Sequence, residues 1–279
     1  MLNCVYIDHD IPIITGSRQL NEKYLSLLRN PVNGERIDMV ETPDGVFLVG
    51  RESRMLFPVR EGIPVFIDPS KLTDASEKSR RYYDILAPFY QFTQSVYYRF
   101  KGGEERARNE YLQYAGVKDG DRVLEVSVGN GVNIQYLPRG ADYFGIDVSW
   151  GQLKRCRELN SRGLSIELFQ AEAEHLPFCD EAFDVVFNVA SINYFEDKRK
   201  AIDEMFRVAK PGARMMIADE TEKAAHAHNK LPIYRGFFNS SKVPVTPPTD
   251  LLPDNATDVK LTEIRNGLYF VLEFRKGNC

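Results

Sequence analysis

The stretch Val123-Leu124-Glu125-Val126-Ser127-Val128-Gly129-Asn130-Gly131 decides the fold of this chain. Its apolar part predicts a buried strand over 122–126, and the glycines after it predict a turn that opens a helix. At such a turn, exposed backbone N–H groups can face a ligand. A dinucleotide fingerprint would place glycine at 127, 129 and 132, but Ser and Val stand at the first and last of these. The pattern therefore favours a nucleotide-like cofactor over a dinucleotide.

An acidic residue stands near the end of three successive predicted strands. Glu125 lies in the first strand, Asp147 ends the second (143–146), and Glu172 follows the third (166–169). Because a parallel sheet brings such strand ends to one crevice, we expect the three acids to lie close together. A carboxylate at a strand tip can accept both hydroxyls of a ribose. Taken singly, each acid is equally well explained as a helix cap or a solvent-facing loop residue.

The rest of this half of the chain alternates strands and helices. Strands are predicted at 185–189 and 214–217, with a helix at 198–209 between them that Lys210-Pro211-Gly212 stops. Two final strands, 259–264 and 268–274, flank Asn266-Gly267, a pair typical of a tight antiparallel turn. The predicted fold class is α/β: a doubly wound, mostly parallel, seven-stranded Rossmann-like sheet with an antiparallel edge.

Composition changes along the chain predict three regions. Residues 1–70 form a small β-rich domain, in which 41–45 is a hairpin turn between strands 36–40 and 46–49. Residues 71–120 form a helical lid and linker that is rich in tyrosine and phenylalanine. Residues 121–279 form the cofactor-binding domain.

Charge and cysteine content limit the partners and the compartment. The 279 residues include 36 Lys and Arg against 40 Asp and Glu, a net charge of -4, which argues against a nucleic-acid binder. No apolar run reaches the roughly 18 residues of a membrane span, and the first residues do not resemble a signal peptide. The four cysteines are scattered without a CxxC pair, so we expect no metal and a cytoplasmic location.

These motifs resemble those of class I S-adenosylmethionine (SAM) dependent methyltransferases, in particular the branch with ubiquinone and menaquinone C-methyltransferases. The likeness covers about residues 82–218. Glu125–Gly131 resembles the acid-glycine loop of that family, Gly145–Ser149 its second strand, and Ala171–Phe178 its adenine-side loop. Phe183–Phe187 resembles the fourth strand, Arg207–Gly212 the turn before the fifth strand, and Tyr83–Tyr90 the lid helix.

The resemblance implies SAM as the cofactor and assigns its contacts. Gly129 and Gly131 would admit the methionine part, Asp147 would hold the ribose, and Glu172 with Ala173 would meet the adenine. Ser127 departs from the family, which usually has glycine there, and its small side chain should still permit binding. The cofactor-binding residues implied are Tyr83, Tyr90, Glu125, Ser127, Gly129, Asn130, Gly131, Asp147, Val148, Glu172, Ala173, Asn188 and Ala190, the last two lining the floor.

The acceptor site is less well defined by the sequence. A small, aromatic or quinone-like molecule fits the aromatic segment, whose tyrosines serve ordinary helix packing equally well. The candidate acceptor contacts are Tyr82, Tyr97, Asn193 and Tyr194, and the candidate general bases are His226, His228 and Tyr194. The two histidines are equally well explained as an inert loop pair.

The first 70 residues resemble the short zinc-ribbon modules found beside some methyltransferases. Where that module carries two CxxC pairs, this chain has Asn30 and Asn33, then Gly50 and Ser53, so we predict a ribbon without metal. Two alternatives stay open. One is an RNA base methyltransferase; the other is a SAM-binding protein without catalysis, whose N-terminal domain contacts a partner chain or a second copy.

Overall fold

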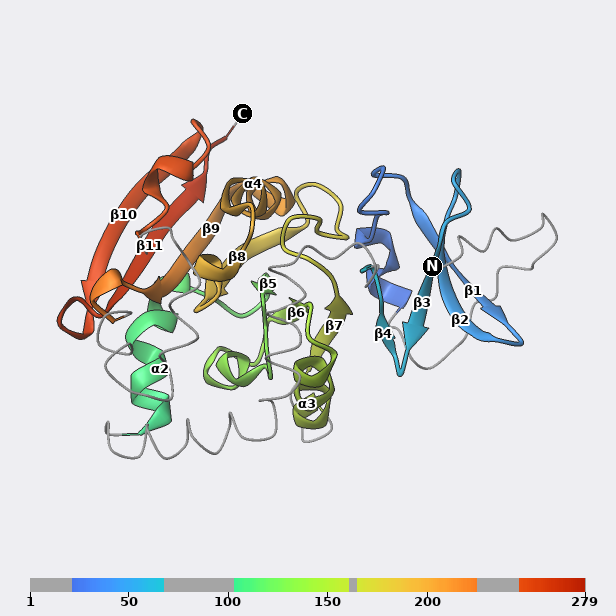
Figure 1. The fold of residues 1–279 in the computed structure, drawn as a ribbon, viewed down its shortest axis with the longest axis horizontal. Coiled ribbons are helices and arrows are strands. Elements are labelled where there is room, and N and C mark those ends of the chain that lie inside the picture. The colour runs from blue at the N-terminus through green and yellow to red at the C-terminus, as the bar shows by residue number, and fades with distance from the viewer. Residues whose placement is uncertain (1–21, 68–102, 161–164, 225–245, 279) are drawn as a thin grey trace.

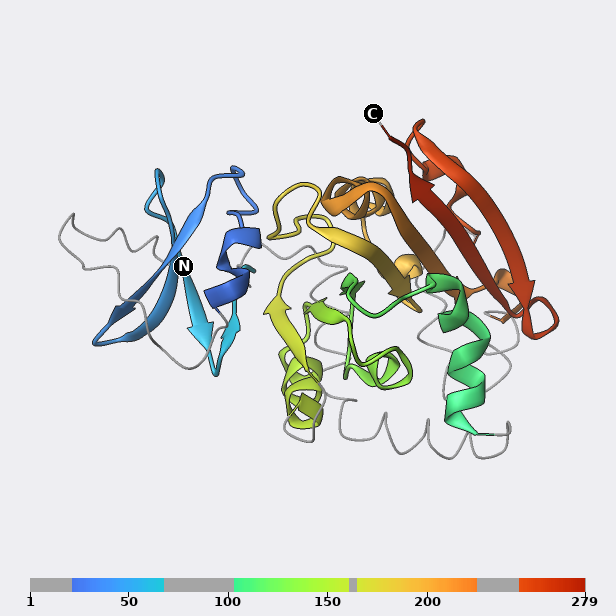
Figure 2. The ribbon, with the colours of Figure 1, turned by 180° about the vertical axis from the view of Figure 1, so that it is seen from behind.

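The computed structural model of this chain describes residues 22–67, 103–160, 165–224 and 246–278 (Figure 1). These residues form two units that we call the N-terminal unit (22–67) and the sheet domain (103–278). Views from the front and from behind both place the N-terminal unit beside strand β7 (Ile166–Gln170) of the sheet domain (Figures 1 and 2).

The N-terminal unit is a small antiparallel sheet with the strand order β1-β2-β3-β4. The β-rich character predicted for this region is confirmed, but the first hairpin turn is tighter than expected. Thr42 pairs with Gly45, so that only Pro43 and Asp44 lie between the strands. The Thr42 hydroxyl accepts a hydrogen bond from the Asp44 amide at 3.2 Å, which stabilises this short turn. The elements are the 3-10 helix η1 (Glu22–Leu27), β1 (Ile37–Thr42), β2 (Gly45–Gly50), β3 (Leu56–Arg60) and β4 (Ile63–Pro64).

The sheet domain is built on seven strands in the order β10-β11-β9-β8-β5-β6-β7. Strands β5 to β9 run parallel to one another, whereas β11 is antiparallel to both β9 and β10. The predicted fold, a mostly parallel sheet with an antiparallel edge, is confirmed. The remaining bounds are β5 (Arg122–Val126), β6 (Asp142–Asp147), β8 (Phe183–Val189), β9 (Ala209–Glu220), β10 (Ala256–Ile264) and β11 (Tyr269–Lys276).

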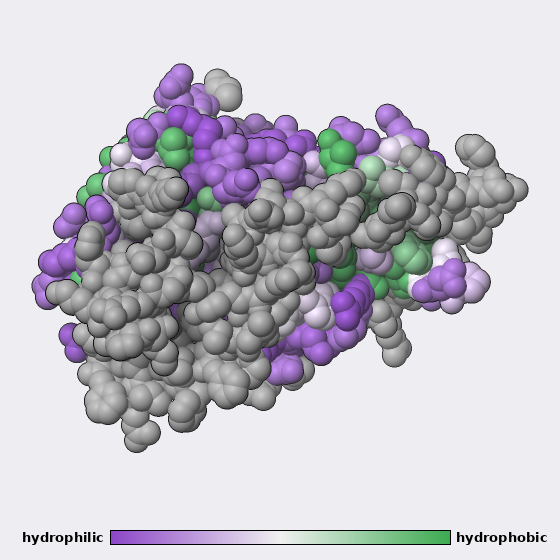
Figure 3. Space-filling view, in the orientation of Figure 1, coloured by the Kyte–Doolittle hydropathy of each residue, from purple (hydrophilic) through white to green (hydrophobic). Residues whose placement is uncertain are grey.

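Helices cover both faces of this sheet. Helix α4 (Lys198–Val208) packs on one face through Ile202, Met205 and Phe206, the apolar face that the sequence predicted. Its opposite side is hydrophilic in the space-filling view (Figure 3). Helices α2 (Glu104–Leu112) and α3 (Trp150–Asn160) pack on the other face, where Tyr111, Leu112, Leu153 and Cys156 are buried.

Two predicted boundaries are wrong. The glycine turn leads only into the short 3-10 helix η3 (Val132–Tyr136), because Pro138 forces Leu137 into an extended conformation and prevents a longer helix. Strand β9 begins at Ala209, directly after α4, where a helix stop was expected. The β8–β9 register shifts between Phe183 and Val185, which accommodates the Pro211-Gly212 turn inside the strand.

The closing hairpin has a longer connection than a two-residue turn. Its loop is the 3-10 turn η8 (Arg265–Gly267), closed by a hydrogen bond from the Leu268 amide to the Arg265 carbonyl at 3.3 Å. Asn266 adopts a φ of 56°, a left-handed conformation that asparagine tolerates better than most residues. Three short 3-10 turns complete the described elements, namely η2 (Gln113–Ala115), η7 (Thr249–Leu251) and η4 (Ile192–Tyr194), which follows β8.

Candidate functional site

The carboxyl ends of β8, β5, β6 and β7 lie next to each other and are joined by hydrogen bonds. The Asn188 side-chain amide on β8 donates to the Val126 carbonyl on β5 at 2.8 Å. The Gly129 amide donates to the Asp147 carboxylate on β6 at 2.8 Å, and the Ala171 amide after β7 donates to the Asp147 carbonyl at 3.2 Å. The three strands near whose ends the acidic residues stand therefore end next to one another, as predicted.

The glycine loop after β5 follows a left-handed path at three positions. The φ angles are 61° at Ser127, 55° at Gly129 and 74° at Gly131. Ser127 thus adopts a conformation that glycine favours, and its backbone carries strain of about 1 kcal/mol. The loop also lies close to β6, because a Cβ added at Gly145 would come within 2.8 Å of the Val128 side chain.

Asp147 is oriented by the loop in front of it. One carboxylate oxygen accepts from the Gly129 amide, and the other accepts from the Ser149 amide at 2.8 Å. A carboxylate oxygen can accept more than one hydrogen bond, so a group of this kind can bind hydroxyl donors as well as amides. Val148 contributes its carbonyl, which accepts from the Gln170 side-chain amide at 2.8 Å.

Glu125 is a buried carboxyl group, with only 1% of its surface exposed. Its Oε1 accepts from the Asn133 side-chain amide at 2.6 Å, while Oε2 is buried without a hydrogen-bond partner in the part of the chain that the structure describes. Burial raises the pKa of Glu125 to about 8, although the Asn133 hydrogen bond and the Arg108 charge lower it. A buried carboxyl oxygen without a partner points to a donor that is absent here.

Helix α2 supplies residues that the sequence did not single out. The Arg108 guanidinium, 8% exposed, donates to the Asn133 side-chain oxygen at 2.7 Å and to the Tyr111 hydroxyl at 3.1 Å. Asn133 thus connects Arg108 to Glu125. The helical spacing of Arg108, Tyr111 and Leu112 was the available signal, but periodicity alone favours packing for such a face.

The remaining predicted cofactor contacts lie around this centre. Ala173 is buried. Glu172 is half-buried, and its Oε2 lies 3.8 Å from the Nδ1 ring nitrogen of His175. Asn188 is fully buried, and its Oδ1 has no hydrogen-bond partner among the described residues. Ala190 is exposed with a φ of 58°, and Asn130 caps the next turn through the Val132 amide at 3.3 Å.

The acceptor-side candidates Asn193 and Tyr194 lie on η4, next to the end of β9. The Asn193 amide donates to the buried Asp219 carboxylate at 3.2 Å, and its side-chain amide donates to the Glu220 carbonyl at 3.3 Å. Burial raises the pKa of Asp219 to about 7. Asn193 therefore braces η4 against β9, and its contact with an acceptor stays a prediction. Six other predicted site residues lie outside the described residues: Tyr82, Tyr83, Tyr90, Tyr97, His226 and His228.

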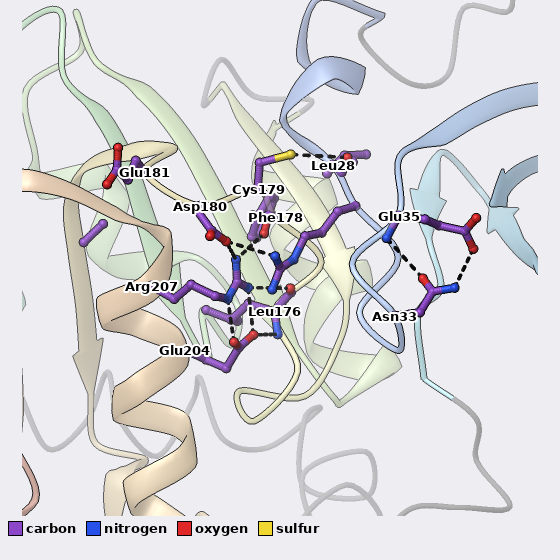
Figure 4. Close-up of polar contacts among 12 residues, drawn as sticks. Leu28, Asn33, Glu35, Leu176, Phe178, Cys179, Asp180, Glu181, Glu204 and Arg207 are labelled. Atoms are coloured by element: carbon purple, nitrogen blue, oxygen red, sulfur yellow. Dashed lines mark hydrogen bonds and ion pairs between the residues drawn. The ribbon is translucent and has the colours of Figure 1, made fainter. Parts of the chain in front are cut away.

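The four positions that would carry zinc ligands in a ribbon converge on Glu35 instead. Its Oε1 accepts from the side-chain amides of Asn30 and Asn33, both at 2.9 Å, and from the Ser53 hydroxyl (Figure 4 shows the Asn33 contact). A Cβ at Gly50 would overlap the same oxygen. Burial alone would raise the pKa of Glu35, but these hydrogen bonds outweigh it and lower the pKa to about 2.

A zinc ion does not fit these residues, because amide and hydroxyl donors around a carboxylate cannot replace four thiolates. No other group of three or more potential metal ligands occurs in the described ranges. In the same ranges, no helix is long and apolar enough to cross a membrane. The absence of a metal from the full chain stays a prediction.

Comparison with known proteins identifies the core of the sheet domain. Residues 124–217 match the model of the family described as "Methyltransferase domain". This stretch of the sheet domain is therefore similar to a methyltransferase domain. In the solved structures, a SAM-dependent methyltransferase from Thermotoga maritima superposes with a TM-score of 0.53 at 19% identity, covering 70% of this chain and 99% of its own. At that identity the likeness shows the fold alone.

Two curated relatives match part of this chain at higher identity. A demethylmenaquinone methyltransferase of Paenarthrobacter aurescens is 31% identical over 157 residues, which are 56% of this chain and 58% of the relative. A phthiotriol/phenolphthiotriol dimycocerosates methyltransferase of Mycobacterium tuberculosis is 38% identical over 103 residues, which are 36% of this chain and 38% of the relative. This chain thus spans only part of the length of the relatives it matches.

The sheet domain has side chains that fit SAM, the cofactor that the similarity to methyltransferases implies. The Oε2 of Glu125, which has no hydrogen-bond partner among the described residues, suits an ammonium group, and the carboxylate of Asp147 suits the hydroxyls of a ribose. Both groups lie on strands β5 and β6, which are neighbours in the sheet. Glu125 and Asp147 are therefore chemically suited to SAM, and the cofactor contacts of the other predicted residues stay predictions.

Proposed function

We propose that this chain is a SAM-dependent methyltransferase that acts on a small, aromatic or quinone-like acceptor. The cofactor class follows from the similarity to a methyltransferase domain, and the acceptor class is suggested by the relative named for demethylmenaquinone. Two neighbouring features carry the proposal. Asp147 accepts a hydrogen bond from the glycine loop, and the buried Glu125 beside it has one carboxyl oxygen without a hydrogen-bond partner among the described residues.

The residues of this chain bind and orient the cofactor rather than carry out a covalent step. With SAM bound, Asp147 would accept the ribose hydroxyls, Glu125 would accept the ammonium, and the turn at Gly129–Gly131 would leave room for the methionine part. When bound, SAM supplies an electrophilic methyl group on a positively charged sulfur. Alignment in a dry pocket is the main requirement for such an in-line displacement. A hydroxyl or ring-carbon acceptor also loses a proton, for which Tyr194, His226 and His228 are the candidate bases.

Calorimetric titration with SAM and with its product S-adenosylhomocysteine tests the cofactor. The native chain should bind both, and Asp147→Ala should weaken binding by about 100-fold, because it removes the charged acceptor of two hydrogen bonds. Asp258→Ala is the matched control, since Asp258 is a largely exposed acid at the sheet edge and should leave affinity unchanged. Failure of the native chain to bind either compound would refute the proposal.

Formation of S-adenosylhomocysteine with a panel of acceptors tests the reaction. A demethylated quinone or a phenol should support turnover, and bulk RNA should not. Turnover on RNA alone would favour the RNA methyltransferase alternative. Tight cofactor binding without turnover on any acceptor would favour a SAM-binding protein without catalysis.

A further inference from the structure

The N-terminal unit is hydrogen-bonded to both ends of one loop of the sheet domain. We call residues 171–176 the cofactor loop, because they contain Glu172 and Ala173. At its start, the Phe66 amide donates to the carbonyl of Gln170, the last residue of β7, at 2.8 Å, and Val65 forms a parallel bridge with the same residue. The segment after β4 thus extends the edge of the large sheet up to the first residue of the cofactor loop.

The other end of the cofactor loop is held by the residues after η1. The Arg29 amide donates to the Pro177 carbonyl at 3.1 Å, and the Cys179 amide donates to the Leu27 carbonyl at 2.7 Å. Leu28, 2% exposed, forms an antiparallel bridge with Phe178 between these bonds. Figure 4 shows Leu28 beside Phe178 and Cys179.

Apolar packing and charges support both junctions. The Tyr24 ring packs edge-on against Phe144 at 4.8 Å between ring centroids, and its hydroxyl donates to Asp142 at 3.0 Å. The Arg29 guanidinium pairs with Asp180 at 2.9 Å. One continuous core contains residues of both units, so the N-terminal unit is packed against the domain and not merely tethered to it.

Within the domain, the cofactor loop is also held at its ends and in its middle. The Ala171 amide donates to the Asp147 carbonyl, and the Leu176 amide donates to the Glu204 carboxylate at 2.8 Å. In the middle of the loop, the Glu174 carboxyl group accepts from the backbone of residues 196 and 197. The N-terminal unit adds backbone bonds at both ends, so the position of Glu172 and Ala173 depends on contacts from both units.

We propose that the N-terminal unit is a working part of the cofactor site: by holding both ends of the cofactor loop, it sets the affinity of the domain for its cofactor. This inference rests on the proposed function, since it takes SAM and its product as the ligands. Leu28 and Arg29 are positioning residues in this arrangement. Because energetic coupling between two sites is reciprocal, cofactor binding must also stabilise the docked N-terminal unit.

Titration of the full chain with S-adenosylhomocysteine tests the first half of this coupling. Leu28→Asp places a carboxylate in the buried contact with Phe178 and should raise Kd about tenfold, whereas Leu28→Met keeps the apolar volume and should restore native affinity. Arg29→Ala removes a cross-unit ion pair outside the core and should raise Kd about threefold. Arg51→Ala is its control, since Arg51 pairs with Asp38 inside the N-terminal unit.

Amide hydrogen exchange tests the reciprocal half. S-adenosylhomocysteine should slow exchange at the Phe66 and Arg29 amides, which donate across the boundary. The Gly50 amide, which donates to Met55 within the N-terminal unit, should change less. A purely structural role for the N-terminal unit would not produce this ligand-dependent difference.

The outcomes separate the inference from the proposed function. If the native chain binds S-adenosylhomocysteine and both Leu28→Asp and Arg29→Ala bind it as tightly as the native chain does, the inference is wrong. If circular dichroism shows that Leu28→Asp is unfolded, the affinity of Arg29→Ala decides. If the native chain does not bind S-adenosylhomocysteine, the proposed function fails. Amide hydrogen exchange without ligand then tests whether the N-terminal unit holds the ends of the cofactor loop. Faster exchange at Ala171 and Leu176 in either variant would then support the hold on the loop, and unchanged exchange would overturn it.

Discussion

Glu125 shows how one buried residue can carry the pH dependence of the site. Burial holds the pKa of its carboxyl group at about 8, so the group is largely protonated in the free protein near neutrality. The ionisable groups around it are Arg108 from α2, Asp147 from β6 and Cys156 from α3, whose thiol pKa is itself raised by burial. An arriving ammonium group favours the ionised carboxylate and lowers its pKa.

We therefore predict that the affinity for S-adenosylhomocysteine rises with pH. Between about pH 6 and about pH 8, Kd should fall at least about tenfold, and binding should release a proton. Calorimetry in two buffers of different protonation enthalpy measures both effects. Glu125→Gln, which cannot ionise, should bind with an affinity independent of pH over this range. Proton uptake on binding by the native chain would contradict this role.

The raised pKa of Glu125 also determines how the free energy of unfolding changes with pH. The folded-state pKa of Glu125 lies above the value of about 4.5 for the unfolded chain, so folding favours the protonated carboxyl. The resulting stabilisation is complete below about pH 4.5 and is lost as the pH rises through about 8. In the free protein Glu125 thus opposes stability at alkaline pH, which is a cost of keeping a cofactor-binding acid in the core.

At the scale of elements, Arg207 in the last turn of α4 connects this helix to the end of the cofactor loop. The guanidinium donates to the carbonyls of Leu176 at 3.1 Å and Phe178 at 2.7 Å, and it pairs with Glu204 and Asp180 (Figure 4). A cation at a helix C-terminus is also favoured by the helix dipole. One side chain thus joins α4 to the segment that follows the cofactor loop.

Replacing Arg207 should therefore destabilise the whole domain. We expect Arg207→Ala to lower the free energy of unfolding by about 2–3 kcal/mol, because several charge-assisted hydrogen bonds are lost and Glu204 keeps a partly buried charge. Urea denaturation measures this change. Lys260→Ala is the control: this side chain is 66% exposed and 3.7 Å from Glu273, so its loss should cost about 0.5 kcal/mol or less. Equal effects of the two substitutions would refute the assignment.

At the scale of the whole molecule, the two units share one core. The largest cluster of buried apolar residues in the described part of the chain joins Leu28, Met39 and Phe57 of the N-terminal unit to Phe144 and Phe178 of the sheet domain. Arg60 also lies over the ring of Trp150 on α3, 4.4 Å from its centroid. Shared burial of this kind couples the unfolding of the two units.

We predict a single unfolding transition for the full chain. Trp150 is the only tryptophan, and it reports on the boundary between the units, whereas far-ultraviolet circular dichroism reports on the backbone of the entire chain. Both signals should give the same denaturant midpoint. A tryptophan transition at clearly lower denaturant concentration would mean that the N-terminal unit detaches before the sheet domain unfolds.

The sequence by itself determined the fold class, most strand positions and the acids of the candidate site. Strand β5 (Arg122–Val126) was predicted with its observed bounds, and Asp147 ends β6 as expected. These features follow from local causes, namely short apolar runs, glycines at turns and the rule that parallel strands end at one edge. Element ends that depend on neighbours, such as the start of β9 at Ala209, were placed less well.

Only the tertiary structure decided which distant residues meet. Asn133 and Arg108, 25 positions apart, come together over Glu125, and Leu28 meets Phe178 some 150 positions away. Convergence of Asn30, Asn33 and Ser53 on Glu35 likewise depends on the packing of two loops. Such contacts carry no local periodicity, because burial and pairing between segments are set by the free energy of the complete core and not by any one stretch of the chain.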